Sequence, residues 1–119
     1  MADDVEPFAV RLEAHPAFDH VQVTGHLDIY TTTQLRDVLS EPGGCTRPVL
    51  VIDLLKVAFM DSTGLGALVA ARRQARARGA VLRLVCQRGA AYRVIRLTKL
   101  DTVLAVFSTL DEATAASPA

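Results

Sequence analysis

The sequence has no excess of charge of either sign, since 13 lysines and arginines balance 13 aspartates and glutamates. Without a net positive charge, bulk electrostatics gives no reason to expect binding to nucleic acid or to a membrane surface. A long apolar run is also missing, because Asp53, Lys56 and Asp61 interrupt the best candidate, so we predict no membrane span. Residues 1–4 are acidic in character and lead into no apolar core, so we expect no secretion signal.

Cysteine is scarce, and the histidines follow no ligand pattern in the sequence. Cys45 and Cys86 form no C-x-x-C pair, which predicts reduced thiols in a cytoplasmic protein. His15, His20 and His26 show no metal-ligand spacing. We therefore expect neither a metal site nor a cofactor.

The chain has 119 residues, half of them hydrophobic, which is enough for one domain with one core. Apolar patterns predict strands at 8–12, from Val21, at 49–55, 81–86 and 104–107, and helices from Thr31, at about 63–78, around 92–100 and from Thr109. This order predicts an α/β fold with a mostly parallel central sheet, an N-terminal antiparallel edge pair and about four helices.

Two of the predicted helices begin with capping-box patterns. Thr31 is followed three positions later by Gln34, and Thr109 by Glu112. The second helix carries four arginines within 72–78, and such a run typically forms a solvated helix face.

The most informative segment is Asp-Ser-Thr-Gly at 61–64, between the strand at 49–55 and the helix at 63–78. That strand has no period-2 polar alternation, which is typical of a parallel strand covered on both faces. A hydroxyl at such a strand-to-helix junction is exposed, and a helix N-terminus favours negative charge. The segment is thus a candidate site for adding or removing a phosphate at Ser62. In the simpler interpretation, Ser62 or Asp61 only caps the helix.

Neighbouring residues favour a functional role for this segment. Gly64 and Gly66 each cost about 1 kcal/mol relative to alanine in a helix. Their presence makes sense if another surface approaches the turn closely. The apolar Phe59 and Met60 just before the turn are expected to be partly exposed and to contact a partner.

Motifs for nucleotide binding and hydrolysis are missing. The loop at 61–66 lacks the G-x-x-x-x-G-K-[ST] order with its lysine, and it lacks G-x-G-x-x-G. The G-x-S-x-G motif of serine hydrolases is absent as well. We therefore expect no enzymatic activity.

Asp28 ends the second predicted strand. Taken alone it is a typical turn carboxylate. In the predicted fold, however, the strand ends near Asp28 and Asp61 share one edge of the sheet, so Asp28 can line the same face as Ser62. The adjacent His26 is expected at the surface.

Residues 25–28, Gly-His-Leu-Asp, resemble the Gly-Glu-Leu-Asp segment of STAS domains, the anti-sigma factor antagonists. Three further segments are similar to that family: 51–66, which resembles its phosphorylation loop, 93–100 and 106–113. The resemblance covers about 6–115 and implies a single STAS-like domain over 1–119. His26 stands where the family usually has glutamate.

The resemblance implies a bacterial, cytoplasmic partner-switching regulator. The unphosphorylated form would bind an anti-sigma factor with serine kinase activity and so release a sigma factor. The kinase would inactivate it at Ser62, with Thr63 as second candidate, and a PP2C-type phosphatase would restore it. The partner-binding surface implied by the resemblance and the loop comprises Asp28, Phe59, Met60, Asp61, Thr63, Gly64 and Leu65.

Two other functions remain open. The chain could be a scaffold or sensory-complex subunit without an active phospho-switch. It could also be a nucleotide-binding protein that uses the loop at 61–66, although the missing lysine and metal ligands disfavour this. The family also includes cytosolic domains of anion transporters, which the lack of a membrane segment disfavours.

Overall fold

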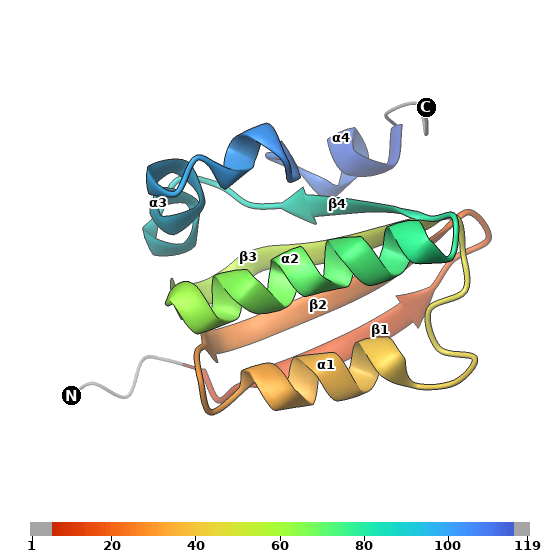
Figure 1. Ribbon diagram of the computed structural model, residues 1–119, viewed down its shortest axis with the longest axis horizontal. Helices are drawn as coiled ribbons and strands as arrows, with labels where there is room; N and C mark the ends of the chain where they lie inside the picture. The colour runs from red at the N-terminus through yellow and green to blue at the C-terminus, as the bar shows by residue number, and fades with distance from the viewer. Residues whose placement is uncertain (1–5, 116–119) are drawn as a thin grey trace.

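Five strands form one sheet in the order β1-β2-β3-β4-β5 in the computed structural model, which describes residues 6–115 (Figure 1). The strands are β1 (Ala9–Ala14), β2 (Phe18–Leu27), β3 (Val49–Met60), β4 (Val81–Val85) and β5 (Ala105–Phe107). The helices are α1 (Thr32–Ser40), α2 (Ser62–Ala77), α3 (Ala90–Leu97), the short 3₁₀ helix η2 (Leu100–Thr102) and α4 (Leu110–Ala115). The element order and the four α-helices confirm the predicted α/β fold.

The sheet is mixed, as predicted. β1 runs antiparallel to β2 at one edge, and β2, β3, β4 and β5 pair in parallel. Parallel pairing places the carboxyl ends of β2 and β3 side by side, with Leu27 opposite Met60. Asp28 and Asp61, the residues that follow these two strands, therefore lie at the same edge of the sheet, which confirms their predicted proximity.

Both faces of β3 are covered. Leu50 and Ile52 pack in the larger core with side chains of α1, α2 and α3. Val49 and Val51, which alternate with them, pack on the other face with Ala113 of α4. Figure 1 shows α1 and α2 lying across one face of the sheet. Over residues 49–54 the sequence of β3 lacks polar alternation because both of its faces are buried there, as predicted.

β3 is five residues longer than the predicted 49–55. Residues from Leu55 onward are largely exposed, so the apolar pattern that marks a buried strand ends there. The backbone continues to pair with β2 as far as Met60, through two irregularities in the register. Sheet pairing, which the burial pattern does not report, therefore extends the strand up to the functional loop.

The first predicted capping box is wrong. Thr31 has helical backbone angles (φ −106°, ψ −16°) and its side chain does not cap α1. Its hydroxyl oxygen instead accepts a hydrogen bond from the Asp28 backbone N–H (2.9 Å) and donates to the His26 carbonyl (2.8 Å). The Thr31 hydroxyl therefore stabilises the turn at Asp28 instead of capping α1.

The second capping box is confirmed with a small displacement. The Glu112 backbone N–H donates to the Thr109 hydroxyl oxygen (3.1 Å). The Glu112 carboxylate accepts from the Ser108 backbone N–H (3.1 Å), one residue before the expected donor. Two backbone N–H groups at the start of α4, those of Ser108 and Glu112, therefore donate to side-chain oxygens.

The arginines of α2 form a largely solvated face, as predicted. Arg73, Arg76 and Arg78 are exposed, and Arg72 is half-buried. Within residues 6–115, no helix combines the length and apolar character needed to cross a membrane.

Candidate functional site

Ser62 is the first residue of α2, and Asp61 is the residue that caps this helix. Asp61 has an extended backbone (φ −104°, ψ −172°), and its Oδ1 accepts a hydrogen bond from the Gly64 N–H at 3.0 Å. Ser62 is exposed, and its hydroxyl makes no hydrogen bond to any of the residues that the structure describes. Asp61 therefore supplies the cap, which leaves the Ser62 hydroxyl accessible.

The loop packs tightly against the end of β2. The Asp61 N–H donates to the Leu27 carbonyl at 3.3 Å. A Cβ at Gly64 would lie 2.5 Å from that same carbonyl oxygen and 2.8 Å from the Met60 Cγ. The close approach at Gly64 is thus made by the protein's own strand, so no partner surface is needed to explain this glycine. At Gly66, in contrast, an added Cβ would meet nothing within 4 Å, so this side of the turn is open.

Three residues predicted to contact a partner are in the interior. Met60 is only 1% exposed, and Gly64 and Leu65 are buried as well. The pleat of β3 explains the error for Met60, because successive side chains point to opposite faces. Phe59 accordingly points outward and is 45% exposed, as expected. Met60, Gly64 and Leu65 position the loop and offer no side-chain surface of their own.

Asp28 organises the turn between β2 and α1. Its Oδ1 accepts hydrogen bonds from the backbone N–H groups of Tyr30 (2.9 Å) and Thr31 (3.2 Å), and the Thr31 hydroxyl oxygen lies 3.2 Å from it. The Asp28 carbonyl accepts from the Thr32 N–H at 3.0 Å. The turn-carboxylate interpretation is therefore correct, and Asp28 remains half-buried at the same sheet edge as Ser62.

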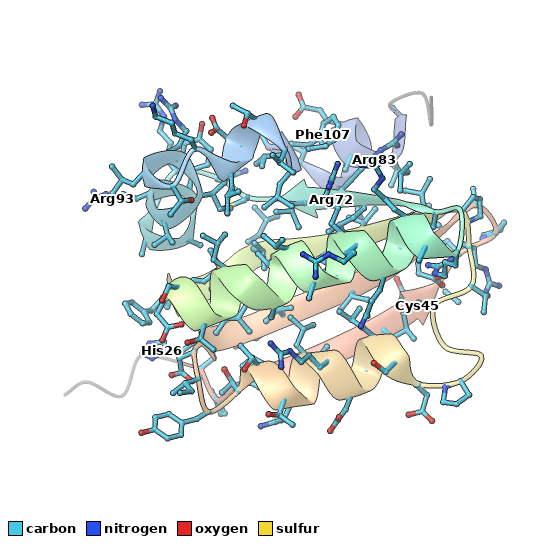
Figure 2. The ribbon with its side chains drawn as sticks, viewed as in Figure 1. His26, Cys45, Arg72, Arg83, Arg93 and Phe107 are labelled. Carbon is cyan, nitrogen blue, oxygen red and sulfur yellow. The ribbon has the colours of Figure 1, made fainter. Side chains whose placement is uncertain are left out.

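Three exposed apolar side chains lie at this sheet edge, those of Phe59, Ile29 and Tyr30, and the last two were not predicted. Ile29 is 61% exposed and Tyr30 is 85% exposed, and both follow directly after Asp28. The ring of His26 lies 5.6 Å from the ring of Phe59, its neighbour across the β2–β3 pair. Figure 2 shows His26 at the end of the molecule where α2 begins. Ile29 and Tyr30 stand in the sequence between a strand end and a helix start, and two large apolar residues in such a turn could have indicated this surface.

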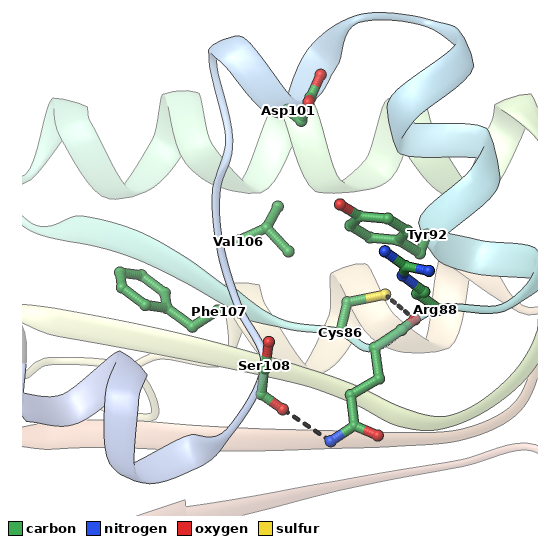
Figure 3. A pocket seen from close by; sticks show the side chains of 8 residues that line it. Cys86, Arg88, Tyr92, Asp101, Val106, Phe107 and Ser108 are labelled. Carbon is green, nitrogen blue, oxygen red and sulfur yellow. Dashed lines mark hydrogen bonds between the residues drawn. The ribbon is translucent and has the colours of Figure 1, made fainter.

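A separate cleft of about 690 Å³ lies at the carboxyl ends of β4 and β5 (Figure 3). It is lined by Cys86, Gln87, Arg88, Tyr92, Asp101, Val106, Phe107 and Ser108. Across it the Gln87 side-chain amide donates to the Ser108 carbonyl at 3.0 Å. Burial raises the pKa of the Cys86 thiol to about 11, so this group stays protonated at neutral pH and is a poor nucleophile. The cleft was not predicted from the sequence.

The fold and the loop together define a class: a small mixed α/β domain that presents an exposed serine at the start of a helix, beside an apolar surface. A family model for the STAS domain matches residues 9–113, and the chain belongs to this family. Relatives from Listeria monocytogenes and Mycobacterium paratuberculosis are both named as anti-sigma factor antagonists.

Three similar proteins illustrate the relationship. The anti-sigma-B factor antagonist of Listeria monocytogenes is 33% identical over 90 residues, covering 74% of this chain and 79% of that protein. An anti-sigma factor antagonist from Mycobacterium paratuberculosis has a crystal structure with a TM-score of 0.82 at 30% identity, covering 91% and 92% of the two chains. SpoIIAA from Bacillus, in its phosphorylated form, has a TM-score of 0.66 at 22% identity over 89% and 96%, a likeness that shows the fold alone.

Proposed function

We propose that this protein is an anti-sigma factor antagonist that works by partner switching. In its unphosphorylated form it binds an anti-sigma factor with serine kinase activity, and a sigma factor is released. Phosphorylation of Ser62 by that kinase ends the binding, and a PP2C-type phosphatase restores it. The names of the relatives from Listeria and Mycobacterium support the antagonist role.

One observation carries the assignment of Ser62. Its hydroxyl is exposed and makes no hydrogen bond within residues 6–115, because Asp61 has taken over the capping role. A kinase can therefore reach the hydroxyl without unfolding the helix start. Thr63 is half-buried, which makes it the second candidate acceptor.

Charge explains how phosphorylation would act. A phosphate adds about −1.5 to −2 charges at neutral pH. The N-terminus of α2 tolerates this charge, although the Asp61 carboxylate next to it is repulsive. We expect no large refolding of the protein itself. A partner packed on the exposed side chains of Ile29, Tyr30 and Phe59 would instead have to bury a dianion beside an apolar contact, which is unfavourable.

The test uses variants as bait in a lysate of the natural host. Ser62→Ala is expected to retain a protein with a histidine-kinase-like ATPase domain, as the unmodified protein does. Ser62→Asp is expected to recover at least tenfold less of it, equivalent to about 1.4 kcal/mol of binding free energy. Ser40→Asp is the matched control, since it places the same charge at an exposed serine in the last turn of α1. Quantitative mass spectrometry measures the recovered protein.

The control separates a local switch from a general effect of charge. Equal recovery by Ser62→Asp and Ser62→Ala would contradict the switch and favour a scaffold that binds constitutively. Equal loss in Ser40→Asp and Ser62→Asp would show that position 62 has no special role.

A further inference from the structure

Three potential metal-ligating side chains lie close together near the turn that joins β1 to β2, although their spacing in the sequence matches no metal-binding motif. Glu13, His15 and His20 each place one potential ligand atom within 4.8 Å of the others. This group lies at the opposite end of β2 from Leu27, and so at the far end of the molecule from the start of α2 (Figure 1). The expectation of no metal site rested on sequence spacing, which does not report proximity across a hairpin.

The hairpin geometry explains the cluster. Glu13 and His20 are direct partners across the antiparallel β1–β2 pair, so their side chains share one face of the sheet. His15 follows the end of β1, and its ring stacks on Phe18 with centroids 4.4 Å apart and planes 11° apart. The stacked ring holds its Nε2 2.9 Å from the Glu13 Oε1. Two of the three groups are therefore already in contact.

The cluster lies on an open part of the sheet. By register, His20 is opposite Val51 of β3, whose side chain belongs to the face on which α4 packs. α4 contacts β3, β4 and β5, away from the β1 edge. A shallow depression of about 140 Å³ lined by Arg11, Glu13, His20 and Gln22 marks this area, so an ion from solvent can reach it.

A buried carboxylate orients His20. The His20 Nε2 lies 2.9 Å from Oδ2 of Asp53, which is only 3% exposed. The other oxygen of Asp53 accepts from the Leu55 N–H at 3.0 Å, which fixes the carboxylate. Because a carboxylate only accepts, Nε2 carries the proton, which places the lone pair of the neutral tautomer on Nδ1. A histidine that donates one ring N–H to a carboxylate and offers the other nitrogen is the common arrangement of metal-ligating histidines.

The donor set selects the cation. Two imidazoles and one carboxylate suit Zn²⁺, whereas Mg²⁺ and Ca²⁺ prefer oxygen ligands alone. Tetrahedral ligands at about 2.0–2.1 Å from zinc lie about 3.4 Å from one another. The ligand atoms lie within 4.8 Å of one another, so the wider separations need closure of up to about 1.4 Å, whereas the 2.9 Å pair of Glu13 and His15 needs to open slightly. Rotation of the exposed Glu13 side chain and the partly exposed His15 ring can supply both movements.

We propose that Glu13, His15 and His20 form a zinc-binding site on the β1–β2 hairpin, with Asp53 as the positioning residue of His20. The ion ties the edge strand β1 and its turn to β2, and through Asp53 to β3. Three protein ligands leave a fourth position for water. The site is remote from Ser62 and independent of the proposed switch.

The test is calorimetric titration of the tag-free full chain with Zn²⁺ at pH 7.5. One equivalent is expected to bind, and Co²⁺ in its place is expected to give the visible absorption bands of a tetrahedral site. His15→Ala and Glu13→Gln, both changes of accessible side chains, are expected to weaken Zn²⁺ binding at least tenfold. Asp53→Asn is expected to weaken it about 10- to 100-fold by loss of orientation. His26→Ala, which removes the remaining histidine at the other end of β2, is expected to bind as tightly as the wild type.

The result that overturns the proposal is equally direct. Absence of stoichiometric Zn²⁺ binding by the wild type would do so, as would unchanged affinity in both His15→Ala and Glu13→Gln. The same holds if His26→Ala loses as much affinity as His15→Ala. Circular dichroism and urea unfolding of each variant show that the compared proteins are folded.

Discussion

At the scale of single residues, adjacent polar side chains at one sheet edge have different tasks. The carboxylates of Asp28 and Asp61 are used by the protein's own backbone, the first in a turn and the second as a helix cap. Because Asp61 accepts from the Gly64 N–H, the Ser62 hydroxyl is not used as the cap of α2. Asp28 is therefore the residue that fixes the turn carrying Ile29 and Tyr30, at the same sheet edge as Ser62.

This distinction gives a stability prediction for Asp28. Asp28→Ala removes the acceptor for two backbone N–H groups, and we expect a loss of about 1–2 kcal/mol in the free energy of unfolding. Asp28→Asn keeps an oxygen acceptor and should lose clearly less. Tyr30→Ala, at an 85% exposed side chain, should leave stability within about 0.5 kcal/mol of wild type. Urea denaturation measures all three, and equal stability of Asp28→Ala and wild type would show that the turn does not depend on this carboxylate.

At the scale of elements, the junction of β3 and α2 is built around the absence of a side chain. Gly64 lets the first turn of α2 sit against the Leu27 carbonyl at the end of β2. This contact fixes the position of the first turn of α2, and with it Ser62, relative to the end of β2. Gly66, two residues later, faces open space and has no such packing role in the described chain.

The two glycines therefore make a matched pair. Gly64→Ala introduces a Cβ 2.5 Å from a backbone oxygen that has little room to move, and we expect destabilisation by about 1–3 kcal/mol. Gly66→Ala improves helix propensity without a clash and should stabilise the protein by about 0.5–1 kcal/mol. Urea unfolding midpoints of the two variants should move in opposite directions. Movement in the same direction would mean that the β2–α2 contact is looser than described.

Sequence patterns predicted the elements well where burial is periodic and less well where pairing or turns decide. The run at 49–55 predicted a strand covered on both faces, which holds for 49–54, and the helices followed from their apolar stripes. The last residues of β3 pair with β2 alone, and because most of their side chains are exposed they gave no signal of a buried strand. Likewise, the pairing of Thr31 with Asp28 could not be told from a helix cap, because both use the same hydroxyl.

At the scale of the whole molecule, the sheet separates two polar regions. The carboxyl ends of β2 and β3 carry Asp28, Ser62 and the exposed apolar side chains, whereas the β1–β2 turn carries the Glu13, His15 and His20 cluster (Figure 1). Asp28 and Ser62 of the first region were predicted because each stands in a short run of informative residues, whereas Ile29 and Tyr30 were not predicted. The second arises only when antiparallel pairing brings its members together, and linear spacing could not reveal it.

The central claim is that Ser62 is the residue whose phosphorylation controls binding. The most direct measurement is mass spectrometry of the tryptic peptide 57–72, from protein purified from its natural host under several growth conditions. We predict a phosphate on Ser62 in a fraction of the molecules that changes with growth condition. A peptide that is never phosphorylated, or that carries phosphate on Thr63 alone, would contradict the claim.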